Sequence, residues 1–293
     1  MDSVRIKSYA KLNLSLDITG RADGYHLLDS VVTSIDIADI ITLKKRKKDS
    51  LVTIAMHGMN SEGIPFEENN AVKAAQDFID VFGTCGVDIT VYKNIPMGAG
   101  LGGSSADVAG VLNGLKKLYG IDDDVKIKEL ADKTGSDCGY MLTGGYARLK
   151  GRGEMVEFID SNLKLNFLLL LPPEPVSTSL CYKTYDKINC KQPPSSDDAN
   201  AALNTGNVFK LGKALSNSLL PAAYSLNPDV GQAIIELKEF APLGVTMTGS
   251  GSCVYALFEN DQYRNYALSR YRGKFRAIAT KTIKGGAVWQ KND

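Results

Sequence analysis

The spacing of apolar positions along the chain changes near residue 70 and again near residue 145. Before residue 70, β-branched residues partly alternate with polar ones, which is typical of half-buried strands. The strands expected in this stretch cover residues 4–9, 12–19, 28–36 and 51–56. Asp23-Gly24 predicts a tight turn between two of them, and the charged run 44–48 predicts a solvated loop or a protected sheet edge.

The middle of the chain has a helical period. The apolar residues on one face of the first helix, expected over residues 70–83, are Val72, Ala75, Ile79 and Phe82. The pattern then predicts a strand over 87–92, a helix that begins in a glycine-rich turn, and a short helix over about 124–134.

The last part of the chain contains an apolar run, residues 167–171, that predicts a buried strand. Other elements expected there are helices at 207–220, 228–240 and 261–272, strands at 245–248 and 254–258 that form a hairpin, and a final strand near 276–283. The polar, proline-rich segment 191–198 predicts a loop. This order predicts an α+β sandwich with helices on one face of an antiparallel sheet.

Composition narrows the class of protein. The 44% hydrophobic content is that of a globular protein, and the net charge of +1 gives no reason to expect a nucleic-acid or membrane-surface partner. No apolar window approaches the length of a spanning helix, and no leader pattern is seen. Five cysteines without a CxxC pair indicate reduced thiols and a cytoplasmic location. Only two histidines are present, which argues against a His-rich metal site and a Ser-His-Asp hydrolase.

The most informative segment is residues 94–107, which joins a predicted strand to a predicted helix and holds four glycines within 98–103. Glycines let the backbone approach a ligand closely, and a helix N-terminus offers free N–H groups and partial positive charge. Phosphate is therefore the expected ligand, facing Ser104, Ser105 and the first amides of the helix.

Four interpretations of this segment compete. Gly98, Gly100 and Gly103 fit the dinucleotide-binding fingerprint, but no second strand leads into the aspartates at 122–124 that would bind ribose. The ATP-binding P-loop motif requires lysine where Ser104 stands. A plain glycine-rich turn leaves the clustering of glycines with two serines unexplained. The fourth interpretation rests on a family resemblance: residues 96–105 resemble the P-x-G-A-G-L-G-S/G-S phosphate loop of GHMP kinases.

Further blocks resemble one branch of that superfamily, the 4-diphosphocytidyl-2-C-methyl-D-erythritol kinases. Residues 8–16, SYAKLNLSL, and 20–28, with D-G-Y-H at 23–26, look like the family's N-terminal block. Residues 247–253, MTGSGSC, resemble its third glycine-rich motif. Segments 134–140 and 144–154 resemble G-A-D-V-P-F and G-G-x-A-x-x-x-G-x-G-E. The resemblance spans about residues 8–258.

The resemblance implies a two-domain α+β fold. Residues 1–160 would form an N-terminal domain like ribosomal protein S5 domain 2, and residues 161–293 a ferredoxin-like α/β sandwich, with the active site in the cleft between them. The implied activity is transfer of the γ-phosphate of ATP, with Mg²⁺, to the 2-hydroxyl of 4-diphosphocytidyl-2-C-methyl-D-erythritol, a step of non-mevalonate isoprenoid synthesis. The nucleotide-binding residues it implies are Pro96, Met97, Gly98, Ala99, Gly100, Leu101, Gly102, Gly103, Ser104, Ser105 and Ala106.

The resemblance also implies catalytic roles for Lys11 and Asp137. A hydroxyl that attacks phosphorus must lose its proton, which a carboxylate can accept, and a lysine stabilises charge on the transferring group. Whether Asp137 is a general base or only orients the hydroxyl stays open. Ser105 is the expected protein ligand for Mg²⁺, and Lys93 is expected beside the nucleotide.

The residues that the resemblance assigns to the substrate are Asn13, Tyr25, His26, Thr178 and Tyr182. Tyr25 and His26 would stack on the cytosine and bind its polar edge, and Tyr182 would close the stack from the other side. Without the resemblance, Tyr182 reads as a core aromatic and His26 as a turn residue. Cys138-Gly139, Thr248 and Cys253 depart from the family pattern and affect fine positioning only. Two rivals stay open: a sister kinase acting on mevalonate, phosphomevalonate or homoserine, and an idle nucleotide-binding relative.

Overall fold

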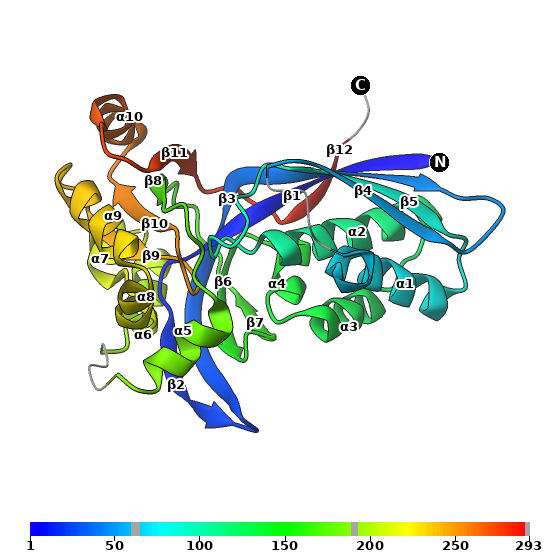
Figure 1. Cartoon of the computed structure of the whole chain (residues 1–293), viewed down its shortest axis with the longest axis horizontal. Helices are drawn as coiled ribbons and strands as arrows, with labels where there is room; N and C mark the ends of the chain where they lie inside the picture. Colours follow the sequence, from blue (N-terminus) through cyan, green and yellow to red (C-terminus); the bar gives the residue numbers. More distant parts are fainter. Residues whose placement is uncertain (60–64, 189–192, 291–293) are drawn as a thin grey trace.

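The computed structural model describes residues 1–59, 65–188 and 193–290, and in these ranges the strands form two sheets with helices packed on them (Figure 1). The first sheet has the order β12 (Ala287–Gln290), β1 (Ser3–Asn13), β3 (Tyr25–Lys45), β5 (Val87–Lys93) and β4 (Val52–Gly58). Further strands extend it through β3, namely β2 (Asp17–Ala22), β6 (Tyr146–Gly151) and, beside β6, β7 (Met155–Phe158). Its ladders are antiparallel except for the parallel pair of β4 and β5.

The strands of the N-terminal part are longer than their alternation predicts. Segments 4–9 and 12–13 belong to one strand, β1, which a register shift at Tyr9/Ala10 interrupts without ending. β3 continues through Lys45, so the charged run 44–48 begins inside a strand and not in a loop. β1 and β5 pair with this end of β3 on either side and hold it extended, although its lysines have a low propensity for strands.

Helices cover one face of the first sheet (Figure 1). They are α1 (Asn70–Phe82), α2 (Gly103–Tyr119), α3 (Asp124–Thr134) and α4 (Cys138–Thr143), with the short 3-10 turn η1 (Phe66–Glu68) before α1. The predicted face of α1 is confirmed, because Val72, Ala75 and Ile79 are buried in this core and Phe82 packs against it. α1 ends at Gly83, whose φ of 62° gives the left-handed cap.

The second sheet is antiparallel and has the order β11 (Arg276–Lys281), β8 (Asn166–Leu171), β10 (Val254–Phe258) and β9 (Gly244–Met247). The helices of this part are α5 (Thr178–Tyr185), α6 (Ser196–Asn204), α7 (Val208–Ala214), α8 (Leu220–Leu226), α9 (Pro228–Lys238) and α10 (Asp261–Arg270). Leu168 and Leu170 face the core formed with α8, α9 and α10. Phe167 and Leu169 face a second core, shared with β1, α6 and α7. The expectation of helices on one face only is therefore wrong, and burial on both faces explains the unbroken apolar run of β8.

Three further expectations need correction. The helix expected over 207–220 is divided into α7 and α8, because Pro221 starts a new helix and Asn217 donates to the carbonyls of Met247 and Gly249, at 2.8 and 2.9 Å. The loop expected at 191–198 already becomes α6 at Ser196, and residues 191–192 lie outside the described ranges. The expectation of a final strand near 276–283 leaves out β12, which exists through its pairing with β1.

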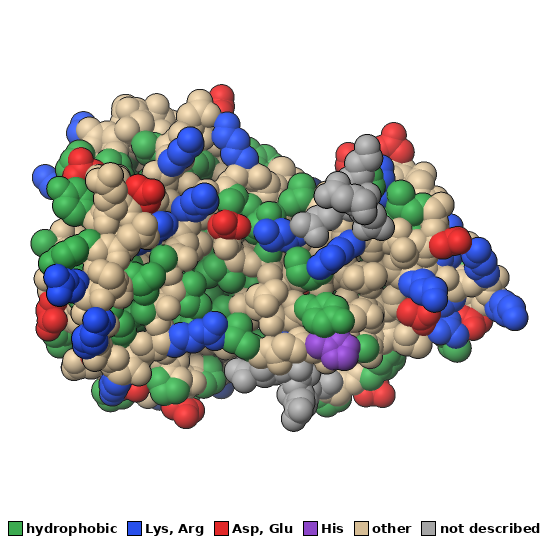
Figure 2. All heavy atoms as spheres, turned by 90° about the horizontal axis from the view of Figure 1, so that it is seen from above, with side chains coloured by type: hydrophobic (Ala, Val, Ile, Leu, Met, Phe, Trp, Pro, Cys, Tyr) green, Lys and Arg blue, Asp and Glu red, His purple; other side chains and the backbone are tan. Residues whose placement is uncertain are grey.

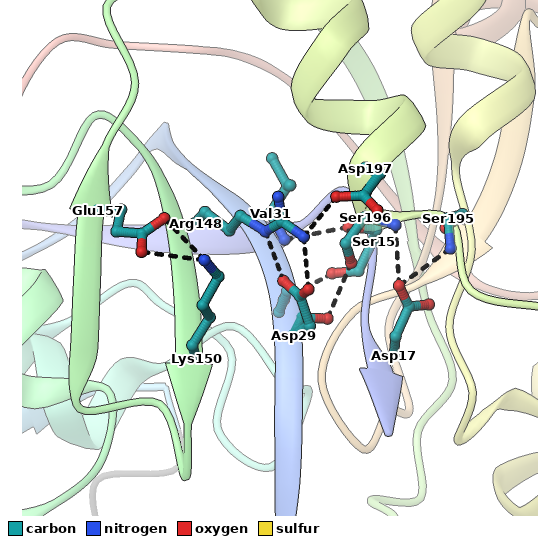
Figure 3. A network of polar contacts seen from close by, with 11 residues as sticks. Ser15, Asp17, Asp29, Val31, Arg148, Lys150, Glu157, Ser195, Ser196 and Asp197 are labelled. Atoms are coloured by element: carbon teal, nitrogen blue, oxygen red, sulfur yellow. Dashed lines mark hydrogen bonds and ion pairs between the residues drawn. The ribbon is translucent and has the colours of Figure 1, made fainter. Parts of the chain in front are cut away.

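A polar network attaches the start of α6 to the first sheet (Figure 3). The carboxylate of Asp17, in β2, accepts a hydrogen bond of 2.8 Å from the backbone N–H of Ser196. Arg148, in β6, makes two hydrogen bonds to Asp29, of 2.7 and 2.6 Å, and one of 2.7 Å to Asp197. The contacts of Ser196 with Asp17 and with the Asp29 carbonyl join the N-terminal strands to a helix more than 160 residues later.

The face shown in Figure 2 carries both signs of charge, with Lys and Arg side chains interspersed among Asp and Glu. This face therefore presents no extended field of one sign. Among the described residues, no helix combines the length and the apolar character needed to cross a membrane.

Candidate active site

Residues 94–102, called the phosphate loop below, connect β5 to α2. Gly98, Gly100 and Gly102 have φ angles of 65°, 76° and 74°, a region that other residues rarely adopt. Gly102 is the N-cap of α2 and provides no side-chain hydrogen bond, so the cap leaves the first N–H groups of this 17-residue helix available. Together with the helix dipole, this arrangement favours an anion at the start of α2.

The phosphate loop lies closely against three other parts of the chain. A Cβ on Gly102 would come within 2.4 Å of Met141 Cε and 3.1 Å of Lys11 Cγ. A Cβ on Gly100 would come within 2.1 Å of the carbonyl oxygen of Thr248. The loop glycines therefore allow β1, α4 and the third glycine segment, residues 247–253, to meet at one point.

Lys11 and Asp137 lie beside this loop. Lys11 is 5% exposed, and its Nζ is 3.5 Å from Asp137 Oδ2 and 2.5 Å from Asn13 Oδ1. Its backbone N–H donates to the carbonyl of Leu101 at 3.0 Å, which attaches β1 to the phosphate loop. About one third of the Asp137 side chain is exposed, so a substrate hydroxyl can reach the carboxylate.

Asp137 is placed by the start of α4. It is the N-cap position of that helix. Burial raises the pKa of the Cys138 thiol to about 12, so the thiol stays protonated. Gly153, with φ of 116°, lets the β6–β7 turn approach the residue before Asp137, since its Cβ would lie 3.3 Å from Ser136 Cβ. The sequence singled out the motif that contains Gly153 but not this contact.

Asn13 joins β1 to the third glycine segment. Its backbone N–H donates to Thr248 Oγ1 at 3.1 Å, and its Oδ1 accepts the N–H of Gly249 at 2.9 Å. Its Nδ2 donates to Ser30 Oγ at 2.8 Å. The Tyr255 hydroxyl donates to its carbonyl at 2.7 Å. Because Asn13 also accepts from Lys11, it aligns the lysine with elements from both sheets.

Thr178 extends this arrangement to α5. Its hydroxyl lies 2.9 Å from that of Ser250, in the third glycine segment, and Ser177 caps the helix that Thr178 begins. Thr178 and Asn13, which the resemblance assigns to the substrate, thus both contact the third glycine segment.

The aromatic residues expected to bind the base are only partly brought together. His26 stacks on Tyr182 with ring centroids 4.7 Å apart and an interplanar angle of 28°. Tyr25, at the tip of the β2–β3 hairpin, is 58% exposed and has Arg152 4.9 Å from its ring centroid. Burial, together with the charge of Asp137, raises the pKa of Tyr182 well above its usual range. The Asp137 carboxylate therefore lies close enough to Tyr182 to affect the ionisation of its hydroxyl.

Two residues near His26 were not found from sequence. Asp186, just after α5, has Oδ1 2.8 Å from His26 Nε2 and Oδ2 2.7 Å from an Arg21 nitrogen. Arg21 comes from β2, so the pair ties the hairpin to α5. The D-G-Y-H motif marks His26, but 160 residues separate it from Asp186, and no spacing rule connects them.

A cavity lies beside the phosphate loop. Its lining includes residues 96–104 of the predicted nucleotide site, together with Met56, Asn69, Ala71 and Lys93. Ser105 and Ala106 are not in the lining, and Ala106 is fully buried. Within the described ranges, no three His, Cys, Asp or Glu side chains gather as a metal site.

Comparison with known proteins identifies the class. The family model described as GHMP kinases N terminal domain matches residues 69–147, and that described as GHMP kinases C terminal matches residues 199–277. The chain belongs to the GHMP kinases, and its fold is that of this family, as the resemblance implied.

Individual relatives show to which branch of the GHMP kinases this chain belongs. The 4-diphosphocytidyl-2-C-methyl-D-erythritol kinase of Caldicellulosiruptor saccharolyticus is 36% identical over 259 residues, which cover 87% of this chain and 88% of the relative. This chain belongs to the 4-diphosphocytidyl-2-C-methyl-D-erythritol kinase family.

Solved structures agree with this assignment. The crystal structure of a 4-(cytidine 5'-diphospho)-2C-methyl-D-erythritol kinase has a TM-score of 0.76 at 28% identity, over 95% of this chain and 99% of that one. A homoserine kinase from Cytophaga hutchinsonii also reaches a TM-score of 0.76, but at 16% identity, over 99% and 98% of the two chains. The second likeness shows a shared fold alone.

Proposed function

We propose that the protein transfers the γ-phosphate of ATP to the 2-hydroxyl of 4-diphosphocytidyl-2-C-methyl-D-erythritol. The observation that carries the proposal is the 3.5 Å approach of Lys11 Nζ to Asp137 Oδ2 beside a glycine loop that begins a helix. Family membership supports both the cosubstrate and the acceptor.

In the proposed reaction, the N–H groups of the phosphate loop and the start of α2 bind the ATP phosphates. Asp137 orients the acceptor hydroxyl and takes its proton as the new O–P bond forms and the bond to the ADP oxygen breaks. Lys11 stabilises the negative charge on the transferring group. Asn13 keeps the lysine aligned through its 2.5 Å hydrogen bond.

Mg²⁺ would neutralise charge on the ATP phosphates when it is bound. The Ser105 hydroxyl, in the first turn of α2, is the proposed protein ligand. A single hydroxyl fits an ion that keeps several waters and is carried mainly by a substrate.

We further propose that the acceptor lies between the two sheets, with a division between domains near residue 160. His26 and Tyr182, which already stack, would hold the cytosine together with Tyr25. Asn13 and Thr178 would bind the methylerythritol and phosphate end. For the cytosine to enter between them, the rings of His26 and Tyr182 have to move apart from the 4.7 Å at which they now stack.

An acceptor panel tests the proposal. Phosphate transfer from ATP is measured with 4-diphosphocytidyl-2-C-methyl-D-erythritol, mevalonate, phosphomevalonate and homoserine, using wild type and Asp137→Asn. We expect turnover with the cytidyl acceptor alone, largely lost in the variant. Turnover with another acceptor would favour a sister activity. Tight ATP binding without turnover on any acceptor would favour an idle relative.

A further inference from the structure

Three buried charged side chains beneath the phosphate loop take no part in the reaction proposed above. Nζ of Lys93, the last residue of β5, lies 2.5 Å from Asp39 Oδ2 and 2.5 Å from Asp107 Oδ2. Their side chains are 2%, 0% and 9% exposed. Asp39 belongs to β3 and Asp107 to α2, so the cluster joins three elements at one point.

The cluster holds both ends of the phosphate loop. Asp39 Oδ1 accepts hydrogen bonds from the backbone N–H groups of Asn94, at 2.6 Å, and Ile95, at 2.9 Å, which are the first two loop residues. Asp107 lies at the far end of the loop, on the helix that the loop begins. Lys93 therefore links the strand that enters the loop to the helix that leaves it.

Stability alone does not account for this cluster. Two carboxylates share one ammonium group, and among the described residues Asp107 Oδ1 has no hydrogen-bond partner. Burial raises the pKa of Asp107 to about 7, with Lys93 opposing the shift and Asp39 adding to it. Well-packed apolar side chains commonly stabilise a fold as much as a buried ion pair or more. The cluster is therefore costly, and its position under the loop indicates a role in the loop's geometry.

We propose that Asp39, Lys93 and Asp107 form a clamp that fixes the distance between the two ends of the phosphate loop, which makes them positioning residues for the nucleotide. The inference rests on the proposed function only in requiring the loop to bind nucleotide phosphates. N–H donors act on phosphate best when they are already in place, and small displacements cost much of their effect.

The test measures the Kd for ADP by isothermal titration calorimetry, without any acceptor. Asp107→Ala removes the link between α2 and Lys93 while leaving Lys93 paired with Asp39. Asp107→Asn keeps an oxygen that can accept from Lys93. Asp88→Ala is the matched control. Asp88 lies at the other end of β5, and it and Asp49 both pair with Arg46, so that two carboxylates share one cation there as well.

We expect Asp107→Ala to weaken ADP binding about 10-fold or more, since loss of alignment at a binding site commonly costs this much. Asp107→Asn should recover most of the affinity, and Asp88→Ala should bind as wild type does. Asp107→Ala should also retain a cooperative urea transition, which separates lost positioning from lost folding. Unchanged ADP affinity in Asp107→Ala, or equal weakening in Asp88→Ala, would overturn the clamp.

Two further outcomes are decisive. If Asp107→Ala does not fold, Asp107→Asn decides, because the clamp then predicts at least a measurable loss of ADP affinity and unchanged affinity contradicts it. If wild type binds ADP and the variants behave as expected, but no acceptor is phosphorylated, the proposed function fails and the clamp stands.

Discussion

Lys11 and Asp137, 126 positions apart in the chain, meet with Nζ and Oδ2 separated by 3.5 Å. Lys11 comes from the strand β1 and Asp137 from the turn before α4, and the phosphate loop packs against the lysine through Gly102. A cation, a carboxylate and an anion-binding loop thus converge, which is the arrangement that phosphoryl transfer to a hydroxyl requires.

Replacing the Asp137 carboxylate should slow phosphate transfer without weakening the binding of ATP. Asp137→Asn keeps the shape of the side chain but cannot accept a proton, so we expect kcat to fall by about 100-fold or more with the KM for ATP little changed. Steady-state kinetics with the cytidyl acceptor measure both. Asp124→Asn, on the exposed start of α3, serves as control. A kcat within a few-fold of wild type would show that Asp137 does not take the proton.

The two ends of α2 offer a matched pair of glycines. Gly102 and Gly120 have φ angles of 74° and 71°, but a Cβ on Gly120 meets nothing within 4 Å, whereas one on Gly102 meets Met141 and Lys11. Gly120→Ala should cost about 1 kcal/mol of unfolding free energy and leave kcat/KM unchanged. Gly102→Ala should cost more and also lower kcat/KM, because Lys11 must move. Urea unfolding and kinetics on both variants check this, and equal effects would contradict the close packing.

Much of the site could be predicted because its parts are local in sequence. The phosphate loop, the D-G-Y-H turn and the third glycine segment each occupy a short run whose residue types reveal its conformation. The Asp39–Lys93–Asp107 cluster and the Asp186–His26 contact depend on pairings across 54 and 160 residues, which no local pattern encodes.

In the fold too, elements with local sequence signals could be predicted, and elements created by distant pairings could not. The helix predicted over 124–134 matches α3, since its period and its Gly135 stop are local signals. β12 was missed because its pairing with β1, near the opposite end of the chain, creates the strand. The full length of β3 was missed for a similar reason, because neighbouring strands on both sides extend it beyond its alternating stretch.

Tyr182 should act in acceptor binding and not as a core aromatic. Stacking of a base on an aromatic ring contributes about 1–3 kcal/mol, so Tyr182→Ala should raise the KM for the cytidyl acceptor about 5-fold or more, while the KM for ATP stays the same. Tyr263→Ala, an exposed tyrosine on α10, should change neither constant. A loss of stability in Tyr182→Ala with both KM values unchanged would assign the ring to the core.

Stability should respond to pH through Asp107. Its pKa is raised by burial from 3.8 to about 7 in the folded protein, so the folded state keeps a proton that the unfolded chain has already lost. The stability that this group contributes is complete below about pH 4 and is lost as the pH rises towards 7. Asp107→Asn should remove this dependence. Urea unfolding at several pH values between 4 and 8 measures it, and parallel profiles for wild type and variant would contradict the assignment.

The most direct test of the proposed function identifies the product of the reaction. Purified protein is incubated with ATP, Mg²⁺ and 4-diphosphocytidyl-2-C-methyl-D-erythritol, and the products are followed by phosphorus NMR and mass spectrometry. We expect one ADP to form for each acceptor consumed, and a new phosphomonoester to appear on the tertiary 2-hydroxyl. An unchanged acceptor, or a phosphate on any other hydroxyl, would contradict the proposed function.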